Sequence, residues 1–128
     1  MELKRVVVTG IGALTPLGNT AEETWENIKA GKSGAGPITH FDASQFKTQF
    51  ACEVKGFNAA DHIDRKEIRK MDLYTQYALA AAQMAIADSG MDLETVDKNE
   101  IGVVLGVGIG GIKTFEEEAG NYAVNGPQ

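Results

Sequence analysis

Two nearly continuous apolar runs constrain the fold of this chain more than any other feature. Residues 5–10 read Arg-Val-Val-Val-Thr-Gly, residues 101–107 read Ile-Gly-Val-Val-Leu-Gly-Val, and each run leads into a glycine-rich turn. Apolar runs that do not alternate with polar residues are typical of strands covered on both faces of a parallel or mixed sheet. We therefore expect two buried core strands in an α/β fold.

A first helix is predicted between these runs. Thr20 followed by Glu23 forms a capping-box pattern, since the hydroxyl and the carboxylate can each bond an orphan backbone N–H. The helix should run from about Ala21 to Ala30 and stop at Gly31. The stretch 32–64 is rich in turn formers, and its one alternating segment, residues 50–54, predicts a short strand.

The longest helical pattern covers residues 66–89 and is followed by Gly90 as a stop signal. Its apolar stripe falls at three- and four-residue spacing and comprises Met71, Tyr74, Ala78, Ala81 and Ala85. The alanines remove side-chain bulk, so another element should approach this helix closely. After a polar connection over residues 92–100, the second strand pattern and its glycines lead to a final helix over about 112–119.

Two strands are too few for a finished domain of this type. A buried strand needs neighbours on both edges and cover on both faces. The order of elements is α/β, but the chain resembles one part of a larger sheet.

Charge and composition exclude several functions. The 128 residues carry 12 Lys and Arg against 18 Asp and Glu, a formal charge of -6 that disfavours binding to nucleic acid. No apolar stretch approaches the ~20 residues of a membrane-spanning helix, so no membrane association is expected. One cysteine and two isolated histidines offer neither a disulfide nor a metal site. We expect a cytoplasmic protein without metal.

No local pattern predicts a catalytic group. Cys52 alternates with apolar neighbours and precedes Glu53, whose charge would raise a thiol pKa, so we interpret it as a small hydrophobic residue of a strand. His40 and His62 have no partners at ligand or triad spacing and are expected to be ordinary surface or turn histidines.

Residues 106–111 read Gly-Val-Gly-Ile-Gly-Gly and match the dinucleotide-binding pattern G-x-G-x-x-G between a strand and a helix. That fingerprint also needs an acidic residue on a second strand about 20 residues later, and Glu116 to Glu118 would lie near the pyrophosphate. The alternative is a glycine turn that lets backbone or an acyl chain approach closely.

Four cations, Arg65, Lys66, Arg69 and Lys70, fall on one sector at the start of the long helix. Cations at a helix N-terminus oppose its dipole. They could form a solvated face paired with nearby acids, which are Asp61, Asp64, Glu67 and Asp72. Alternatively, they could dock an acidic macromolecule.

Four separated motifs, in order, resemble one family. They are residues 5–19, His40-Phe41-Asp42, residues 65–72 and residues 106–111. The family is the β-ketoacyl-[acyl-carrier-protein] synthases, and the resemblance is closest to bacterial synthase II. It implies a thiolase-like layered fold, normally homodimeric, of which residues 1–128 are a partial N-terminal domain that ends before the nucleophile.

The resemblance also implies a reaction. Family members elongate acyl chains by decarboxylative Claisen condensation of an acyl-enzyme with malonyl-acyl carrier protein, through a cysteine and two histidines. These residues would lie C-terminal to Gln128, and Cys52 does not match the nucleophile, so no catalytic residue is assigned and the chain alone should be inactive. No bound cofactor is implied, because the substrates are carried on the phosphopantetheine of acyl carrier protein.

Four positions are carried over from the family. Lys66, Arg69 and Lys70 match the helix that docks the acidic carrier protein, and Ile109 matches a residue of the acyl pocket. Two alternatives remain open at this stage: a truncated dinucleotide-binding fold and a stand-alone module that binds carrier protein.

Overall fold

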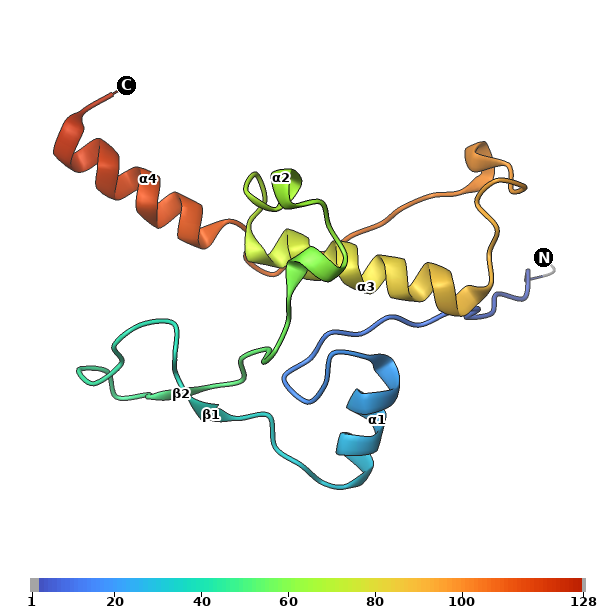
Figure 1. The fold of residues 1–128 in the computed structure, drawn as a ribbon, viewed down its shortest axis with the longest axis horizontal. Helices are drawn as coiled ribbons and strands as arrows, with labels where there is room; N and C mark the ends of the chain where they lie inside the picture. Colours follow the sequence, from blue (N-terminus) through green and yellow to red (C-terminus); the bar gives the residue numbers. More distant parts are fainter. Residues whose placement is uncertain (1–2, 128) are drawn as a thin grey trace.

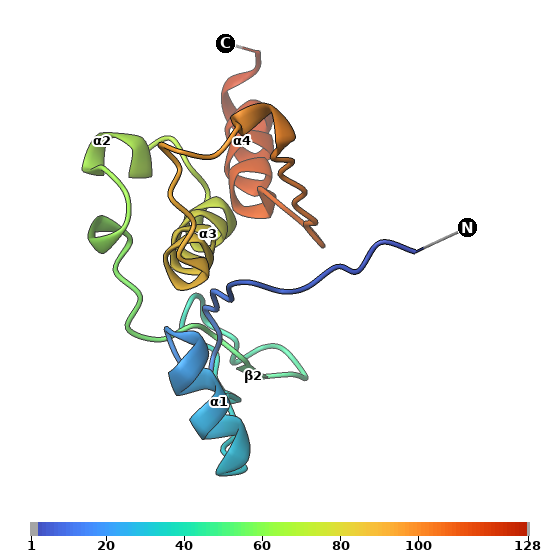
Figure 2. The ribbon, with the colours of Figure 1, turned by 90° about the vertical axis from the view of Figure 1, so that its right-hand side faces the viewer.

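The computed structural model describes residues 3–127. Its helices and strands, in chain order, are α1 (Ala21–Lys29), β1 (Gly36–Pro37), β2 (Phe50–Ala51), η1 (Ala59–Asp61), α2 (Arg65–Ile68), α3 (Leu73–Ser89), η2 (Lys98–Glu100) and α4 (Ile112–Asn125). The two views place α1 and α4 on opposite sides of α3 (Figures 1 and 2). Helix α3 is therefore the central element of the described chain.

The N-terminal segment packs closely against the alanine face of α3. A Cβ built on Gly12 would lie 1.9 Å from the carbonyl oxygen of Ala81, and one on Gly10 would lie 2.2 Å from that of Ala85. The Ile11 amide donates to an Asp88 carboxylate oxygen at 2.8 Å. The prediction that alanines admit a close neighbour is confirmed, and the neighbour is an extended segment that runs alongside α3 (Figure 1).

Helix α1 has the caps that the sequence predicts. The Thr20 hydroxyl accepts from the Glu23 amide at 3.1 Å, and the Glu23 carboxylate accepts from the Asn19 amide at 2.8 Å. Gly31 has φ +64°, the left-handed conformation that favours glycine at a helix end. Because these signals act within one turn of backbone, the bounds of the helix can be predicted from the local sequence.

The excursion after α1 forms one minimal hairpin. Strands β1 and β2 pair antiparallel, with Gly36 opposite Ala51 and Pro37 opposite Phe50. The strand predicted over residues 50–54 is thus shorter than expected. Cys52 lies just beyond it and is exposed, so the interpretation of this thiol as a strand's hydrophobic residue was wrong.

The two predicted core strands are absent from the described residues. Segments 5–10 and 101–107 are extended but have no strand partners, and their apolar side chains face solvent; Val104 is 95% exposed. An extended segment forms a regular strand only when its backbone N–H and C=O groups bond to those of a neighbouring strand. Within residues 3–127 no segment pairs with either run.

The long helix predicted over residues 66–89 is broken between Ile68 and Leu73. The Gln76 side-chain amide donates to the carbonyl of Met71 at 2.9 Å, which uses an acceptor that a continuous helix would give to a backbone N–H. Asp64 caps α2, and Asp72 begins α3. The final helix was correctly placed, but it extends beyond residue 119 to Asn125.

Candidate functional site

The first candidate region is the basic cluster, which we define as Arg65, Lys66, Arg69 and Lys70 on α2 and the turn that follows it. All four residues are exposed. Asp64 orients the start of α2, because its carboxylate accepts from the Lys66 amide at 2.7 Å. The cluster is therefore presented on a short capped helix at the surface.

Neighbouring acids neutralise little of the basic cluster. Lys70 pairs with Glu67 at 2.6 Å, but among residues 3–127 no carboxylate lies within 4.0 Å of the side-chain nitrogens of the other three cations. Asp61 bonds Asn58, and Asp72 bonds Thr114 at 2.6 Å. The alternative that these acids pair with all four cations therefore holds for Lys70 only. The cluster retains a net positive charge.

The second candidate region is the glycine turn, residues 106–111, which carries Ile109. The Ile109 side chain is 77% exposed and faces an open cavity of about 720 Å³. The apolar lining comes from three separate parts of the chain, namely Phe41, Phe46, Leu73, Tyr74, Ile109 and Ile112. Phe41 and Phe46 form an edge-to-face pair with ring centroids 5.6 Å apart. The surface beside Ile109 suits an apolar ligand.

A second cavity of about 670 Å³ lies next to the first and has a more polar lining. Arg69 and Lys70 of the basic cluster line it. The two cavities share the residues His40, Asp72, Leu73 and Lys113. The structure therefore brings the basic cluster and Ile109 to adjoining cavities, although Ile109 lies 39 positions after Lys70 in the sequence. Sequence patterns give no signal for this proximity, because the two regions are far apart in the sequence.

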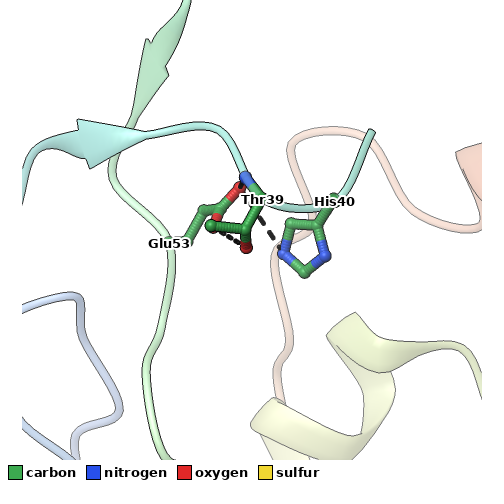
Figure 3. Close-up of polar contacts among 3 residues, drawn as sticks. All are labelled: Thr39, His40 and Glu53. Atoms are coloured by element: carbon green, nitrogen blue, oxygen red, sulfur yellow. Dashed lines mark hydrogen bonds and ion pairs between the residues drawn. The ribbon is translucent and has the colours of Figure 1, made fainter. Parts of the chain in front are cut away.

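His40, which lines both cavities, lies beside Thr39 and Glu53 in a small polar group (Figure 3). The Glu53 carboxylate accepts from the Thr39 hydroxyl at 2.7 Å and from the Thr39 amide at 2.9 Å. These bonds, the hydroxyl's first, lower the pKa of Glu53, and the side chain is only 12% exposed. His40 Nε2 lies 3.9 Å from the same carboxylate. The proximity of His40 to Glu53 is a feature that the sequence did not indicate.

Tyr77 on α3 lies close enough to sense the Glu53 charge. Burial raises the pKa of its phenol, and the negative charge of Glu53 adds to the shift. The Tyr77 ring packs edge-to-face on Phe57, with centroids 5.0 Å apart, and Phe57 stacks on His62. His62 is therefore a structural residue at the end of η1, in agreement with its interpretation as an ordinary turn histidine.

Residues 3–127 contain neither a metal-binding cluster nor a membrane-spanning helix. No group of three or more His, Cys, Asp or Glu side chains is arranged to hold a metal ion. None of the helices in this range combines the length and the apolar character needed to cross a bilayer.

Comparison with known proteins gives consistent matches. The family profile described as "Beta-ketoacyl synthase, N-terminal domain" matches residues 3–126. The 3-oxoacyl-[acyl-carrier-protein] synthase 2 of Synechocystis sp. is 45% identical over 127 residues, which cover 99% of this chain and 30% of the relative. The protein of the same name from Coxiella burnetii is 44% identical over 128 residues, covering 100% and 31%. The chain thus spans less than a third of the length of these relatives.

Solved structures agree. A structure described as a type II PKS acyl-carrier protein in complex with its ketosynthase bound to the hexaketide matches with TM-score 0.75 and 27% identity, covering 94% of this chain and 32% of that one. The ishigamide ketosynthase/chain length factor matches with TM-score 0.64 and 40% identity, covering 69% and 22%. The arrangement of elements around α3 is therefore one found in ketosynthases.

Proposed function

Because this chain belongs to the β-ketoacyl synthase family, we propose that it forms part of an acyltransferase that elongates acyl chains in fatty acid biosynthesis. Its part in the work is to dock acyl carrier protein and to contribute one wall of the acyl pocket. The observation that carries the proposal is the adjacency of an under-neutralised basic cluster and an apolar cavity beside Ile109. A substrate that is an apolar chain on an acidic carrier needs both features.

The basic cluster supports docking of an acidic partner. The cations of Lys66 and Arg69 are exposed and, among the described residues, unpaired with carboxylates, in a chain with a formal charge of -6. A local positive patch on a negative surface steers a negative partner to one place and raises its association rate. Lys66, Arg69 and Lys70 are therefore the residues proposed to contact the carrier.

The proposed reaction is a decarboxylative Claisen condensation. An acyl group moves from the carrier's thiol to an enzyme cysteine, malonyl-carrier loses carbon dioxide, and the carbanion attacks the acyl thioester and expels the cysteine thiolate. The product is a 3-oxoacyl group on the carrier. In this proposal the cysteine and two histidines lie outside the 128 residues, so the chain alone is inactive, and no free cofactor takes part.

Three finer features belong to the same proposal: residues 1–128 are a partial N-terminal domain, the complete protein has a layered thiolase-like fold, and it works as a cytoplasmic homodimer. The unpaired extended segments 5–10 and 101–107 support the first two, because further strands would pair with them. The relatives' greater length supplies the residues for those strands.

The geometry disfavours the dinucleotide alternative. A pyrophosphate would bind at the start of α4, but the Asp72 carboxylate already bonds Thr114 there and lies 3.1 Å from the position of a Cβ on Gly111. A fixed negative charge at this point would repel the phosphates.

A binding experiment tests the docking proposal. Charge reversal of Lys66 and Arg69 to glutamate should weaken binding of acyl carrier protein about ten-fold at low salt, measured by fluorescence anisotropy. Lys32→Glu changes an exposed cation outside the cluster and is the matched control. Added salt should weaken the unaltered complex. Equal affinity of the cluster variant and the control would refute the proposal.

Intact-mass measurement tests the absence of a nucleophile. After incubation with acyl-carrier protein the 13.7 kDa chain should keep its mass. An acyl adduct that disappears in Cys52→Ser would place a nucleophile within these residues and contradict the site assignment.

A further inference from the structure

Asp72 occupies the N-cap position of α3 but does not use its side chain to cap that helix. Its backbone carbonyl accepts from the amides of Thr75 and Gln76 at 3.0 and 3.2 Å. The carboxylate instead accepts from the Thr114 hydroxyl at 2.6 Å, across 42 positions of sequence. An aspartate at this position usually bonds the N–H groups of its own helix, so its side chain is committed to another element.

That element is the first turn of α4, which lacks the usual devices of a helix start. Its N-cap is Gly111, which has no side chain, and no acidic residue lies in its first turn. Thr114 is the third residue of the helix, and the other Asp72 oxygen lies 3.1 Å from the position of a Cβ on Gly111. Asp72 therefore places a carboxylate beside the positive end of the α4 dipole, which is the charge that this end favours.

The glycine turn is held at a second point as well. A Cβ on Gly110 would lie 2.9 Å from the Tyr74 ring, so the ring packs directly on the turn backbone. Ile109 precedes these two contacts by one and two residues. The direction in which Ile109 faces the 720 Å³ cavity thus depends on where Asp72 and Tyr74, at the start of α3, hold residues 110–114.

We propose that Asp72 is a positioning residue for acyl-chain selection: its bond to Thr114 fixes the glycine turn so that Ile109 lines the acyl cavity. This inference rests on the proposed function, in which the cavity receives the acyl chain. Asp72 lies two residues after Lys70, the last residue of the basic cluster, and lines both cavities. Asp72 therefore lies between the surface proposed to dock the carrier protein and the cavity proposed to bind the acyl chain.

The first test measures local order in the 128-residue chain. Thr114→Val removes the hydroxyl but keeps the shape, and Thr114→Ser keeps the hydroxyl as the matched control. Amide exchange over residues 109–115 should become about ten-fold faster in the valine variant, the effect of losing about 1.4 kcal/mol, and should be unchanged in the serine variant. Exchange in α3 should be unchanged in both. Equal exchange of the valine and serine variants over residues 109–115 would overturn the proposal.

Asp72→Asn separates charge from hydrogen bonding. The amide oxygen can still accept from Thr114, but the negative charge at the start of α4 is gone. Exchange over residues 109–115 should fall between the wild-type and valine values. Wild-type exchange in both the asparagine and the valine variants would show that the bond does not position the turn.

The second test measures selection itself, in a full-length synthase 2 that carries residues 3–126 of this chain in place of its own. Thr114→Val should change the ratio of kcat/KM for long and short acyl donors at least about five-fold, with the KM for carrier protein unchanged, and Thr114→Ser should restore the wild-type ratio. Ile109→Phe is the reference. If it shifts the ratio and Thr114→Val does not, the inference fails while the proposed function stands. If Ile109→Phe has no effect, the proposed pocket fails, and the role of Asp72 in acyl-chain selection fails with it.

Discussion

Replacing Gly12 with alanine should separate the N-terminal segment from α3. The added Cβ would lie 1.9 Å from the Ala81 carbonyl oxygen, whereas ordinary contact begins at 3.4 Å, so the segment must retreat by about 1.5 Å. The obstacle is helix backbone, which cannot rotate away. A retreat of that size also breaks the 2.8 Å bond from the Ile11 amide to Asp88.

The magnitude follows from these two losses. Overpacking costs about 1–3 kcal/mol and a lost hydrogen bond about 0.5–1.5 kcal/mol, so Gly12→Ala should lower the free energy of unfolding by about 1.5–4.5 kcal/mol. In a urea titration followed by helical circular dichroism, this is a fall in midpoint of about 1–2 M.

Gly102→Ala is the matched control, because a Cβ at that position meets nothing within 4 Å. Its free energy of unfolding should stay within about 0.5 kcal/mol of wild type. If Gly12→Ala and Gly102→Ala unfold at the same urea concentration, the close contact between the N-terminal segment and α3 does not exist in solution, and the reasoning is refuted.

Three further predictions concern local features. The Thr39 hydrogen bonds lower the pKa of Glu53 in the folded chain. The contribution of Glu53 to stability is therefore complete above the ordinary carboxyl pKa and is lost as the pH falls through the lowered value. Thermal midpoints of Glu53→Gln should fall less steeply with acid than those of wild type, and equal slopes would contradict this. Thr20→Ala removes the α1 cap and should cost about 1 kcal/mol in urea titration, with Thr20→Ser near wild type. Gly31→Ala, at φ +64° in open space, should cost about 1–2 kcal/mol, whereas no change in the urea midpoint would show that α1 does not end in this conformation.

Sequence alone predicted those features that depend on neighbouring residues. The Thr20 and Glu23 caps and the glycine stops at Gly31 and Gly90 are confirmed, because each acts within about one turn of backbone. The alanine face of α3 was also predicted correctly, although its partner was not. The close approach to this face could be predicted because it requires only small side chains, which the sequence shows directly.

Features that depend on distant residues were not predictable. The strand patterns at residues 5–10 and 101–107 describe side chains suited to a buried sheet, but within residues 3–127 they have no pairing partner. At the break before α3, the Gln76 side chain donates to the Met71 carbonyl, and the Asp72 carboxylate accepts from Thr114, which is 42 positions away in the sequence. The basic cluster and Ile109 line adjoining cavities although they are far apart in the sequence, so the sequence motifs identify both regions but not their proximity.

The unpaired segment 101–109 also affects how an isolated chain behaves at high concentration. Unbonded N–H and C=O groups on an extended apolar segment are a template for strand pairing with another copy. Lys4 and Arg5 flank the N-terminal run and oppose such pairing by charge repulsion, but no charged residue occurs between Glu100 and Lys113. Aggregation of the isolated chain should therefore begin at residues 101–109, and a lysine at Val104, which is 95% exposed, would act as a gatekeeper there.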